Sequence, residues 1–344
     1  MKQIISTFII VIFGVSLTMA QPKIKIVPKE SEKKVEVLID GNLFTSYIYP
    51  DNVAKPVLWP IISDGGNELT RQYPFKNKAG ERVDHPHHVG VWLNYGDVNG
   101  LDFWNNSEAI SPDRADKYGT IFHETIEQVK SGKGKGSLTT TASWKDNSGK
   151  QLLKEIIEHT FSVKGKTRII DRTTMLKAVN GKVDITDNKE GMFAIRVTRE
   201  LELPAKGKLK LVDSHGVVTE VEATDDDVST ANYLSSEGVE GGAVWATRAK
   251  WMKLYGEING EKVAIVIYDH PGNPGYPTYW HARGYGLFSA NTLGQKVFSK
   301  GKEEMNFSLE NGESATFRYR LAVFSGEPTV EEIEALSKDF ESKI

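Results

Sequence analysis

The sequence contains no cysteine and no excess of basic residues. Without cysteine the chain has no thiol nucleophile, disulfide, iron–sulfur cluster or thiolate-bound zinc. A metal ion would therefore need histidine and carboxylate ligands. Lysine and arginine number 43 against 46 aspartates and glutamates, a net charge of −3. Because there is no basic surplus to neutralise a phosphate backbone, we expect no nucleic-acid partner.

Long apolar runs are also scarce, and the one extended run lies at the N-terminus. Lys2 precedes an apolar stretch over residues 4–15, and small residues lead up to Ala20. This arrangement is typical of a cleavable signal peptide over residues 1–20. The run is shorter than the ~20 residues that a membrane-spanning helix needs. We therefore expect a mature chain over residues 21–344, periplasmic or secreted, with no stable membrane span.

Most of the mature chain alternates between apolar and polar residues, the pattern of strands with one buried face. Two such runs flank Asp40-Gly41, which indicates a β-hairpin. Residues 217–242 have no strong period, and we expect them to form a surface insertion. Strands joined by turns rich in glycine and asparagine are predicted over residues 35–39, 43–49, 121–129, 137–144, 152–163, 168–179, 193–203, 243–256, 263–269, 284–290 and 316–324.

One helix is expected, at the C-terminal end of the chain. Thr329 and Glu332 have the spacing of a capping box, and four apolar residues between positions 330 and 340 fall on one helix face. Together the elements predict an all-β fold, a large antiparallel β-sandwich in a single domain over residues 21–344 with a C-terminal helix. Two β domains joined near residue 115 are the alternative.

Three of the eight histidines lie within four residues, at His85, His87 and His88. Glycine and proline interrupt this segment and the residues that follow it, which predicts an irregular loop. Loops held by a rigid sandwich commonly carry function. In an extended backbone His85 and His87 share one face and His88 points to the other. The His85–His88 loop is therefore the first candidate site.

A second polar cluster lies between residues 268 and 286, where proline and glycine again predict a rigid exposed loop. It carries His270, Trp280, His281 and Arg283. The planar guanidinium of Arg283 can bind a carboxylate or two hydroxyls, and Trp280 offers a flat face to a sugar ring. We predict that this loop and the His85–His88 loop meet in one cleft.

The strings that contain these residues resemble a known family. The segments 85–90, 96–104, Lys189-Glu190-Gly191 and 269–286 are similar to the PmoA-like family of unknown function, common in secreted proteins of Bacteroidetes and Planctomycetes. The resemblance covers about residues 40–325, and many members carry arginine where this chain has Val89. It implies a galactose-mutarotase-like supersandwich that works on saccharides.

The leading hypothesis is a carbohydrate-active enzyme of epimerase, lyase or glycosidase type, acting on a saccharide or glycan. Imidazole titrates near neutral pH, so His87 or His88 and His281 are the predicted acid–base groups, with Glu190 as their carboxylate partner. The side chains predicted to hold or stack on the substrate are Asn99, Asp102, Trp104, Lys189, Trp280, Arg283 and Tyr285.

Two other classes of protein use the same residues. A divalent-metal enzyme, oxygenase-like as the label of the family suggests, would bind its metal through His85, His87 and His270. A non-catalytic saccharide-binding protein would use the aromatic rings alone. Apart from this metal ion, the sequence points to no cofactor. Elemental analysis separates the metal enzyme from the others, and product formation separates an enzyme from a binding protein.

Overall fold

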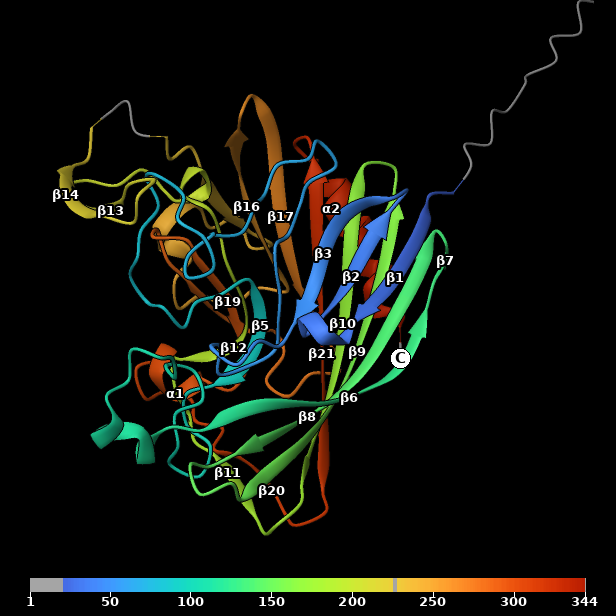
Figure 1. Ribbon diagram of the computed structural model, residues 1–344, viewed down its shortest axis with the longest axis vertical. Helices are drawn as coiled ribbons and strands as arrows, with labels where there is room; N and C mark the ends of the chain where they lie inside the picture. The colour runs from blue at the N-terminus through green and yellow to red at the C-terminus, as the bar shows by residue number, and fades with distance from the viewer. Residues whose placement is uncertain (1–20, 225–227, 344) are drawn as a thin grey trace, which may run out of the picture.

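The structure is a computed structural model that describes residues 21–224 and 228–343, so the predicted signal peptide lies outside the described residues. Two large antiparallel sheets form its body (Figure 1). In the described chain the first sheet has nine strands, in the order β18 (Tyr279–Ala282), β19 (Leu287–Asn291), β12 (Gly191–Arg196), β5 (Val91–Tyr95), β4 (Val57–Leu58), β3 (Asn42–Ile48), β2 (Lys34–Ile39), β1 (Lys23–Lys29) and β7 (Gly132–Lys133).

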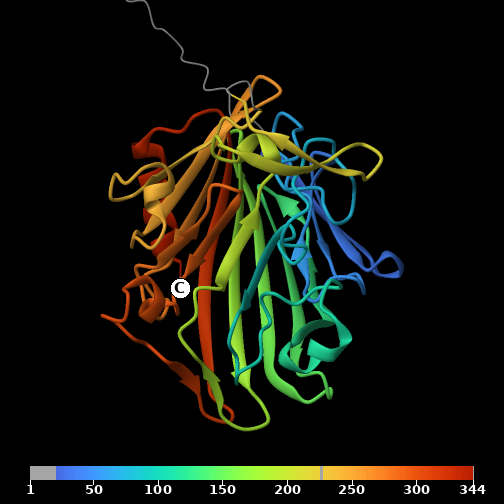
Figure 2. The ribbon, with the colours of Figure 1, turned by 90° about the vertical axis from the view of Figure 1, so that its left-hand side faces the viewer.

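The second sheet has eight strands within the same ranges, and its long members run side by side along the long axis of the molecule (Figure 2). The predicted all-β antiparallel sandwich is therefore confirmed. The order of this sheet is β15 (Asn232–Ser235), β16 (Trp251–Ile258), β17 (Glu261–Asp269), β21 (Ser314–Ser325), β10 (Thr167–Ala178), β9 (Gln151–Lys164), β8 (Lys135–Lys145) and β6 (Thr120–Lys130).

The main core lies between the two sheets because alternate residues of each strand point inward. Ile157 and Phe161 of β9 reach it from the eight-stranded sheet, and Phe193 and Ile195 of β12 reach it from the nine-stranded sheet. The nine-stranded sheet combines strands from before and after residue 115, and the core cluster includes residues from both halves of the chain.

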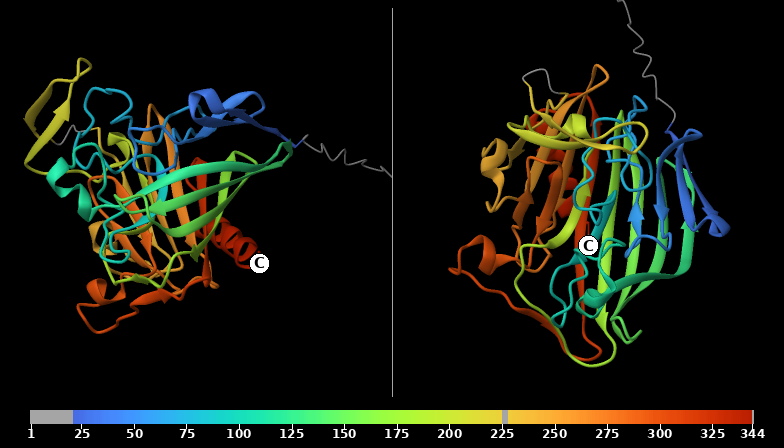
Figure 3. Two further views of the ribbon diagram at one scale, coloured as in Figure 1. Left: turned by 60° about the horizontal axis from the view of Figure 1, so that its bottom comes forward. Right: turned by 60° about the vertical axis from the view of Figure 1, so that its left-hand side comes forward.

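The C-terminal helix α2 (Val330–Glu341) packs on the outer face of the eight-stranded sheet (Figure 3). Ile333, Leu336 and Phe340 bury one side of the helix against that sheet. The Thr329 side chain accepts a hydrogen bond from the backbone of Glu332, whose own side chain caps the backbone of Thr329. The predicted helix and its capping box are confirmed.

Three of the predicted boundaries were wrong. The strand expected over residues 243–256 is a 3-10 turn, η4 (Gly241–Val244), followed by β16. The strand expected over 193–203 stops at Arg196, before the 3-10 turn η3 (Arg199–Leu201). The insertion over 217–242 contains β15 and also β14 (Val218–Glu222), which pairs with β13 (Lys208–Val212). Every residue of β14 is exposed, so burial imposes no alternation on its sequence.

No helix among the described residues has both the length and the apolar character needed to cross a bilayer.

The remaining elements are short and lie at the edges of the sandwich. The short elements are the 3-10 turns η1 (Glu30–Glu32) and η2 (Pro112–Lys117), the helix α1 (Gln295–Phe298), and the pair β11 (Val183–Ile185) and β20 (Phe307–Leu309).

Candidate functional site

The outer face of the nine-stranded sheet positions the site. Alternate residues of β12 point into the main core, which leaves Ala194 and Arg196 on the opposite face. The register aligns Ala194 with Trp92 of β5 and with Ser289 of β19, and Ser289 with His281 of β18. One row of outward side chains therefore crosses four strands, with small residues at its middle.

The His85–His88 loop covers this row and meets the second predicted loop above it. The buried ring of His88 stacks on Trp92 with centroids 5.5 Å apart and packs against Trp104 at 5.7 Å. The His85 ring lies parallel to His88 at 4.8 Å, and the Tyr285 ring lies parallel to His85 at 5.0 Å. The structure thus brings the two loops together through His85 and Tyr285.

Two buried arginines hold the His85–His88 loop in place. Asp84 accepts hydrogen bonds from Arg196 Nη2 at 2.6 Å and Arg71 Nη1 at 3.0 Å. Arg71 Nη2 also donates to the backbone carbonyls of His85 at 2.8 Å and His88 at 2.9 Å. Burial alone would raise the pKa of Asp84, but the hydrogen bond from His85 and the charges of Arg196 and Arg71 hold it well below its usual range. Asp84 is therefore ionised at neutral pH.

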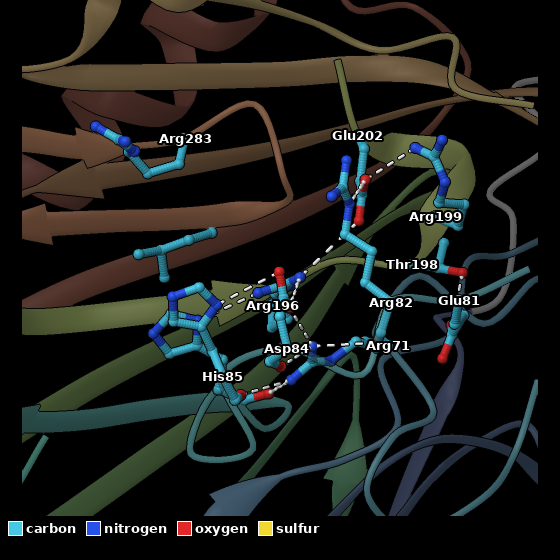
Figure 4. Close-up of polar contacts among 12 residues, drawn as sticks. Arg71, Glu81, Arg82, Asp84, His85, Arg196, Thr198, Arg199, Glu202 and Arg283 are labelled. Atoms are coloured by element: carbon cyan, nitrogen blue, oxygen red, sulfur yellow. Dashed lines mark hydrogen bonds and ion pairs between the residues drawn. The ribbon is translucent and has the colours of Figure 1, made fainter. Parts of the chain in front are cut away.

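A second carboxylate extends this cationic network away from the loop. Glu202 Oε2 accepts hydrogen bonds from Arg82 Nε at 2.7 Å and Arg199 Nη1 at 2.8 Å, and Oε1 lies 3.9 Å from Arg196 Nη2. Burial raises the pKa of Glu202, although the three guanidinium groups oppose the shift. Figure 4 shows Asp84 and Glu202 surrounded by these arginines. Guanidinium groups outnumber carboxylates in the network, so the region carries an excess of positive charge.

Three buried imidazoles of this region, those of His87, His88 and His281, are uncharged at neutral pH. Burial, reinforced by neighbouring cations, lowers the pKa of His88 well below its usual range and does the same to His87. Burial likewise lowers the pKa of His281 to about 3. Arg196 Nη1 lies 3.3 Å from Nδ1 of His88. Because a guanidinium can only donate, Nδ1 accepts and the proton of His88 is on Nε2.

Several buried nitrogens around the loop have no hydrogen-bond partner among the described residues. They are Nε2 of His87, Nε2 of His88, Nε1 of Trp104 and Nδ1 of His281. A buried polar atom without a partner costs roughly 1–3 kcal/mol, so such atoms are rare outside functional sites. Their concentration in one place marks this region as a candidate ligand site.

His281 and Glu190 form a loose imidazole–carboxylate pair. Nδ1 of His281 lies 3.8 Å from Oε2 of Glu190, just beyond hydrogen-bond distance. Glu190 also forms an ion pair with the exposed Lys189 beside it, and its backbone nitrogen donates to the Asn188 side chain at 2.9 Å. The structure therefore brings together His281, Glu190 and Lys189, as the sequence predicted.

A hollow of about 370 Å³ opens beside this region. Arg82 and Arg283 line it together with the half-buried rings of Trp245 and Tyr285. Its volume lies within the ~300–1,000 Å³ range of ligand pockets. Sequence reasoning missed Trp245 because the segment that contains it reads as a strand, and the real chain turns there at η4.

Two of the predicted ring-stacking residues are buried. Trp104 and Trp280 are both 0% exposed, and Nε1 of Trp280 donates to the carbonyl of Ala249 at 3.0 Å. A sugar stacks on an aromatic face that is open to solvent, so the prediction that these two rings stack on the substrate was wrong. The half-buried rings of Trp245 and Tyr285 line the hollow instead.

Asn99 and Asp102 hold loops instead of facing the hollow. Oδ1 of Asn99 accepts a hydrogen bond from the backbone of Asp184 at 2.7 Å. Oδ1 of Asp102 accepts hydrogen bonds from the backbone nitrogens of Trp104 and Asn105, each at 2.9 Å. Both side chains hydrogen-bond to the chain itself and neither lines the hollow, so the structure does not place them beside the other predicted substrate-binding residues.

The predicted metal site is not assembled. Nε2 of His270 lies 2.9 Å from the carbonyl of Lys343, and Nδ1 accepts a hydrogen bond from Gly272 at 3.0 Å. Its ring packs against Phe340 of α2, so His270 is part of the helix interface and does not join His85 and His87. Within residues 21–224 and 228–343 no group of three or more histidines and carboxylates is arranged to hold a metal ion.

Buried charges are the functional residues that sequence reasoning missed. Arg196 interrupts an apolar strand, which is an available sign of a buried charge with a specific partner. Lys55 is also buried: its Nζ donates to the carbonyl of His87 at 2.7 Å and lies 5.3 Å above the Trp92 ring. Burial lowers the pKa of Lys55 to about 7.

Gly90 is the point at which the His85–His88 loop enters β5. Its φ is +58°, and an added Cβ would lie 2.3 Å from the carbonyl oxygen of Leu58. Gly90→Ala is therefore expected to lower the free energy of unfolding by about 3 kcal/mol or more, measured by urea denaturation. Gly41 has φ +87° with nothing within 4 Å of an added Cβ, so Gly41→Ala is the matched control. Gly41→Ala should lower the free energy of unfolding by about 1–2 kcal/mol. An equal loss in both variants would contradict a close contact at Gly90.

Fold and site together define a large antiparallel β-sandwich protein with an arginine-rich polar site on the outer face of one sheet. The chain belongs to the Family of unknown function (DUF6807), whose model matches residues 34–338. The prediction of a family of unknown function over nearly the whole mature chain is thus confirmed, and its PmoA-like label stays a prediction. No curated protein matches the sequence.

Among solved structures, the chain is similar to carbohydrate-active enzymes. For the α-galactosidase AgaA of Geobacillus stearothermophilus the identity is 10% and the TM-score 0.40, over 82% of this chain and 40% of that one. A putative aldose 1-epimerase of Escherichia coli K12 has 13% identity and a TM-score of 0.32, and the match covers 89% of this chain and 100% of that one. A polysaccharide lyase has 11% identity and a TM-score of 0.35, and the match covers 94% of this chain and 35% of that one. The chain spans about two fifths of the galactosidases it matches, and likenesses at this level carry no argument about activity.

Proposed function

We propose that this protein is a carbohydrate-active enzyme that moves a proton on a saccharide through the Asp84–His85 pair. The observation that carries the proposal is the His85 ring, whose side chain is 41% exposed above an otherwise buried polar cluster. Its Nδ1 lies 3.4 Å from Oδ2 of Asp84. A carboxylate at one ring nitrogen fixes the tautomer and leaves the other nitrogen to accept or return a proton.

The other imidazoles have a supporting role in this proposal. His87, His88 and His281 are buried, and their lowered pKa values make them weak bases. Their unpartnered nitrogens are buried, so the three rings pack beside the pair and are not placed against the sugar. The His281–Glu190 pair, whose Nδ1 and Oε2 atoms lie 3.8 Å apart, is the second candidate for proton transfer.

The state of Asp84 favours an epimerase or lyase type of reaction over a glycosidase type. A glycosidase needs a carboxylic acid whose raised pKa lets it protonate the leaving group. Asp84 is held ionised by Arg71 and Arg196, so it cannot serve as that acid at neutral pH. An imidazole oriented by an ionised carboxylate is suited to removing a proton from carbon.

Location outside the cytoplasm is part of the same proposal. Its support is the signal-peptide pattern of residues 1–20, which predicts a mature chain that begins at Gln21. The absence of cysteine means that folding there does not depend on disulfide formation.

Replacing His85 should remove turnover without unfolding the protein. His85 has φ +44°, so His85→Asn is the suitable change, because asparagine tolerates this conformation and lacks the imidazole. We expect turnover to fall about 100-fold or more, the usual contribution of a general acid–base group. The measurement is transfer of solvent deuterium into saccharides by NMR, together with the appearance of unsaturated products.

Two comparisons make this test decisive. His215→Gln removes a histidine whose side chain is 85% exposed on a distant turn, and it should leave turnover unchanged. The free energy of unfolding of the His85→Asn variant should stay within about 1 kcal/mol of wild type, because the ring is exposed. Full turnover in the folded His85→Asn protein would overturn the proposed role. Saccharide binding without any product would identify a binding protein instead.

A further inference from the structure

We propose that the hollow lined by Arg82 and Arg283 binds an anionic group of the saccharide, a uronate carboxylate or a sulfate ester. This inference rests on the proposed function and names the class of its substrate. Among the described residues that line the hollow, Arg82 and Arg283 are the charged ones, and no carboxylate lines it.

Arg283 is an exposed cation whose charge is not neutralised by the chain. Across the described residues its guanidinium forms no ion pair and no hydrogen bond, and it points away from the Asp84–Glu202 network (Figure 4). It lies 5.7 Å from the ring centroid of Trp245 and 5.9 Å from that of Tyr285. The two rings restrain the side chain without cancelling its charge. The guanidinium is therefore preorganised with its donors available to a ligand.

Arg82 supplies a second cation to the hollow. Only its Nε is engaged, by Glu202 at 2.7 Å, and its terminal amino groups donate no hydrogen bond within the described chain. Glu202 also accepts from Arg199, so its single charge is shared. The electrostatic potential in the hollow is consequently positive, which favours an anion over a neutral group of the same shape.

The aromatic walls favour a sugar over a small free anion. The half-buried rings of Trp245 and Tyr285 line the same hollow as the two arginines. Nε1 of Trp245 is a buried donor without a partner among the described residues. A pyranose ring with one anionic substituent would use all three features: an aromatic face, a hydrogen-bond donor and a guanidinium fork. A small ion alone would leave the aromatic surface unused.

The test compares matched probes on the intact mature protein by calorimetry. The probes are an α-1,4-linked trigalacturonate, its methyl ester, which keeps the rings and loses the charge, and a sulfated galacto-oligosaccharide with its desulfated form. We expect one acidic probe to bind at least ~10-fold more tightly than its neutral counterpart. Which of the two shows this preference identifies the carboxylate or the sulfate as the group recognised.

Variants assign the preference to the hollow. Arg283→Gln should reduce the preference for the acidic probe to within ~3-fold, and Arg283→Lys should retain part of it, because the charge stays and the planar fork is lost. Arg114→Gln is the matched control, since Arg114 is also an exposed arginine against an aromatic ring, Tyr118, outside the hollow. It should leave the preference unchanged.

The outcomes separate this inference from the function on which it rests. Equal binding of acidic and neutral probes, or a preference that survives Arg283→Gln in a folded protein, overturns the anionic subsite and leaves a neutral saccharide as substrate. Failure of every saccharide to bind overturns both the subsite and the proposed function.

Discussion

Arg196→Met is expected to lower the free energy of unfolding by about 3–5 kcal/mol, the usual cost of breaking a buried ion pair by removing one partner. Arg196 is 0% exposed, and its guanidinium bonds to Asp84 at 2.6 Å and lies 3.3 Å from Nδ1 of His88. It also lies 5.0 Å from the centroid of the Tyr285 ring. Its loss leaves the carboxylate of Asp84 partly unpaired and removes the support of both loops.

Urea denaturation at pH 7 measures this effect, and an exposed ion pair provides the control. Lys208 and Glu220 form a pair at 2.8 Å with side chains that are 66% and 46% exposed. Lys208→Met should therefore cost less than about 1 kcal/mol. An Arg196→Met loss as small as that of Lys208→Met would show that the network does not hold the loops.

Acid is expected to destabilise the protein steeply, beginning near pH 6.5. Burial lowers the pKa values of six histidines below their ordinary value of 6.5: His87, His88, His123, His159, His270 and His281. Below pH 6.5 the unfolded chain binds protons that the folded protein does not, so protonation favours unfolding. Above pH 6.5 the contribution of each such histidine to the free energy of unfolding is constant. Below pH 6.5 each one lowers the free energy of unfolding by about 1.4 kcal/mol per pH unit.

The slope of the free energy of unfolding between pH 6 and pH 5 measures this effect. His159→Leu replaces a buried ring in β9, outside the candidate site, and should lower the slope by about 1.4 kcal/mol per pH unit. His215→Gln buries no imidazole and should leave the slope unchanged. A slope that His159→Leu does not alter would mean that this ring becomes protonated in the folded protein.

Asp84 acts in a different pH window. Its pKa in the folded protein is held below the ordinary value of 3.8, so its contribution is complete above about pH 4 and is lost as the pH falls further. The Asp84 contribution is therefore constant above pH 5. Burial raises the pKa of Asp269 to about 7, which opposes the histidine effect in that range, so the effect is read as the difference in slope between wild type and His159→Leu.

The elements that depend on residues close together along the chain could be predicted from the sequence. The long strands β9 and β10 alternate in burial over most of their length, and the capping box of α2 involves residues three positions apart. The polar loops could also be identified, because histidines and arginines stand out between proline and glycine residues. The all-β class and the two candidate loops were therefore readable without coordinates.

The partners of those polar residues could not be predicted from sequence. Asp84 pairs with Arg196, 112 positions later, because the register of β5 and β12 places Arg196 beneath the His85–His88 loop. An amino-acid type does not reveal which aromatic rings are covered: Trp104 and Trp280 are buried, whereas Trp245 and Tyr285 remain partly open.

The sequence by itself determined the strands, the C-terminal helix and the residues able to do chemistry, because these depend on local patterns of polarity and backbone preference. The tertiary structure alone decided that His85 and Arg283 remain exposed while His88 and Arg196 are buried. The physical reason is that solvent exposure, charge pairing and pKa are set by side chains that arrive from distant strands. Strand pairing across the sandwich brings those side chains together, and no short stretch of sequence encodes it.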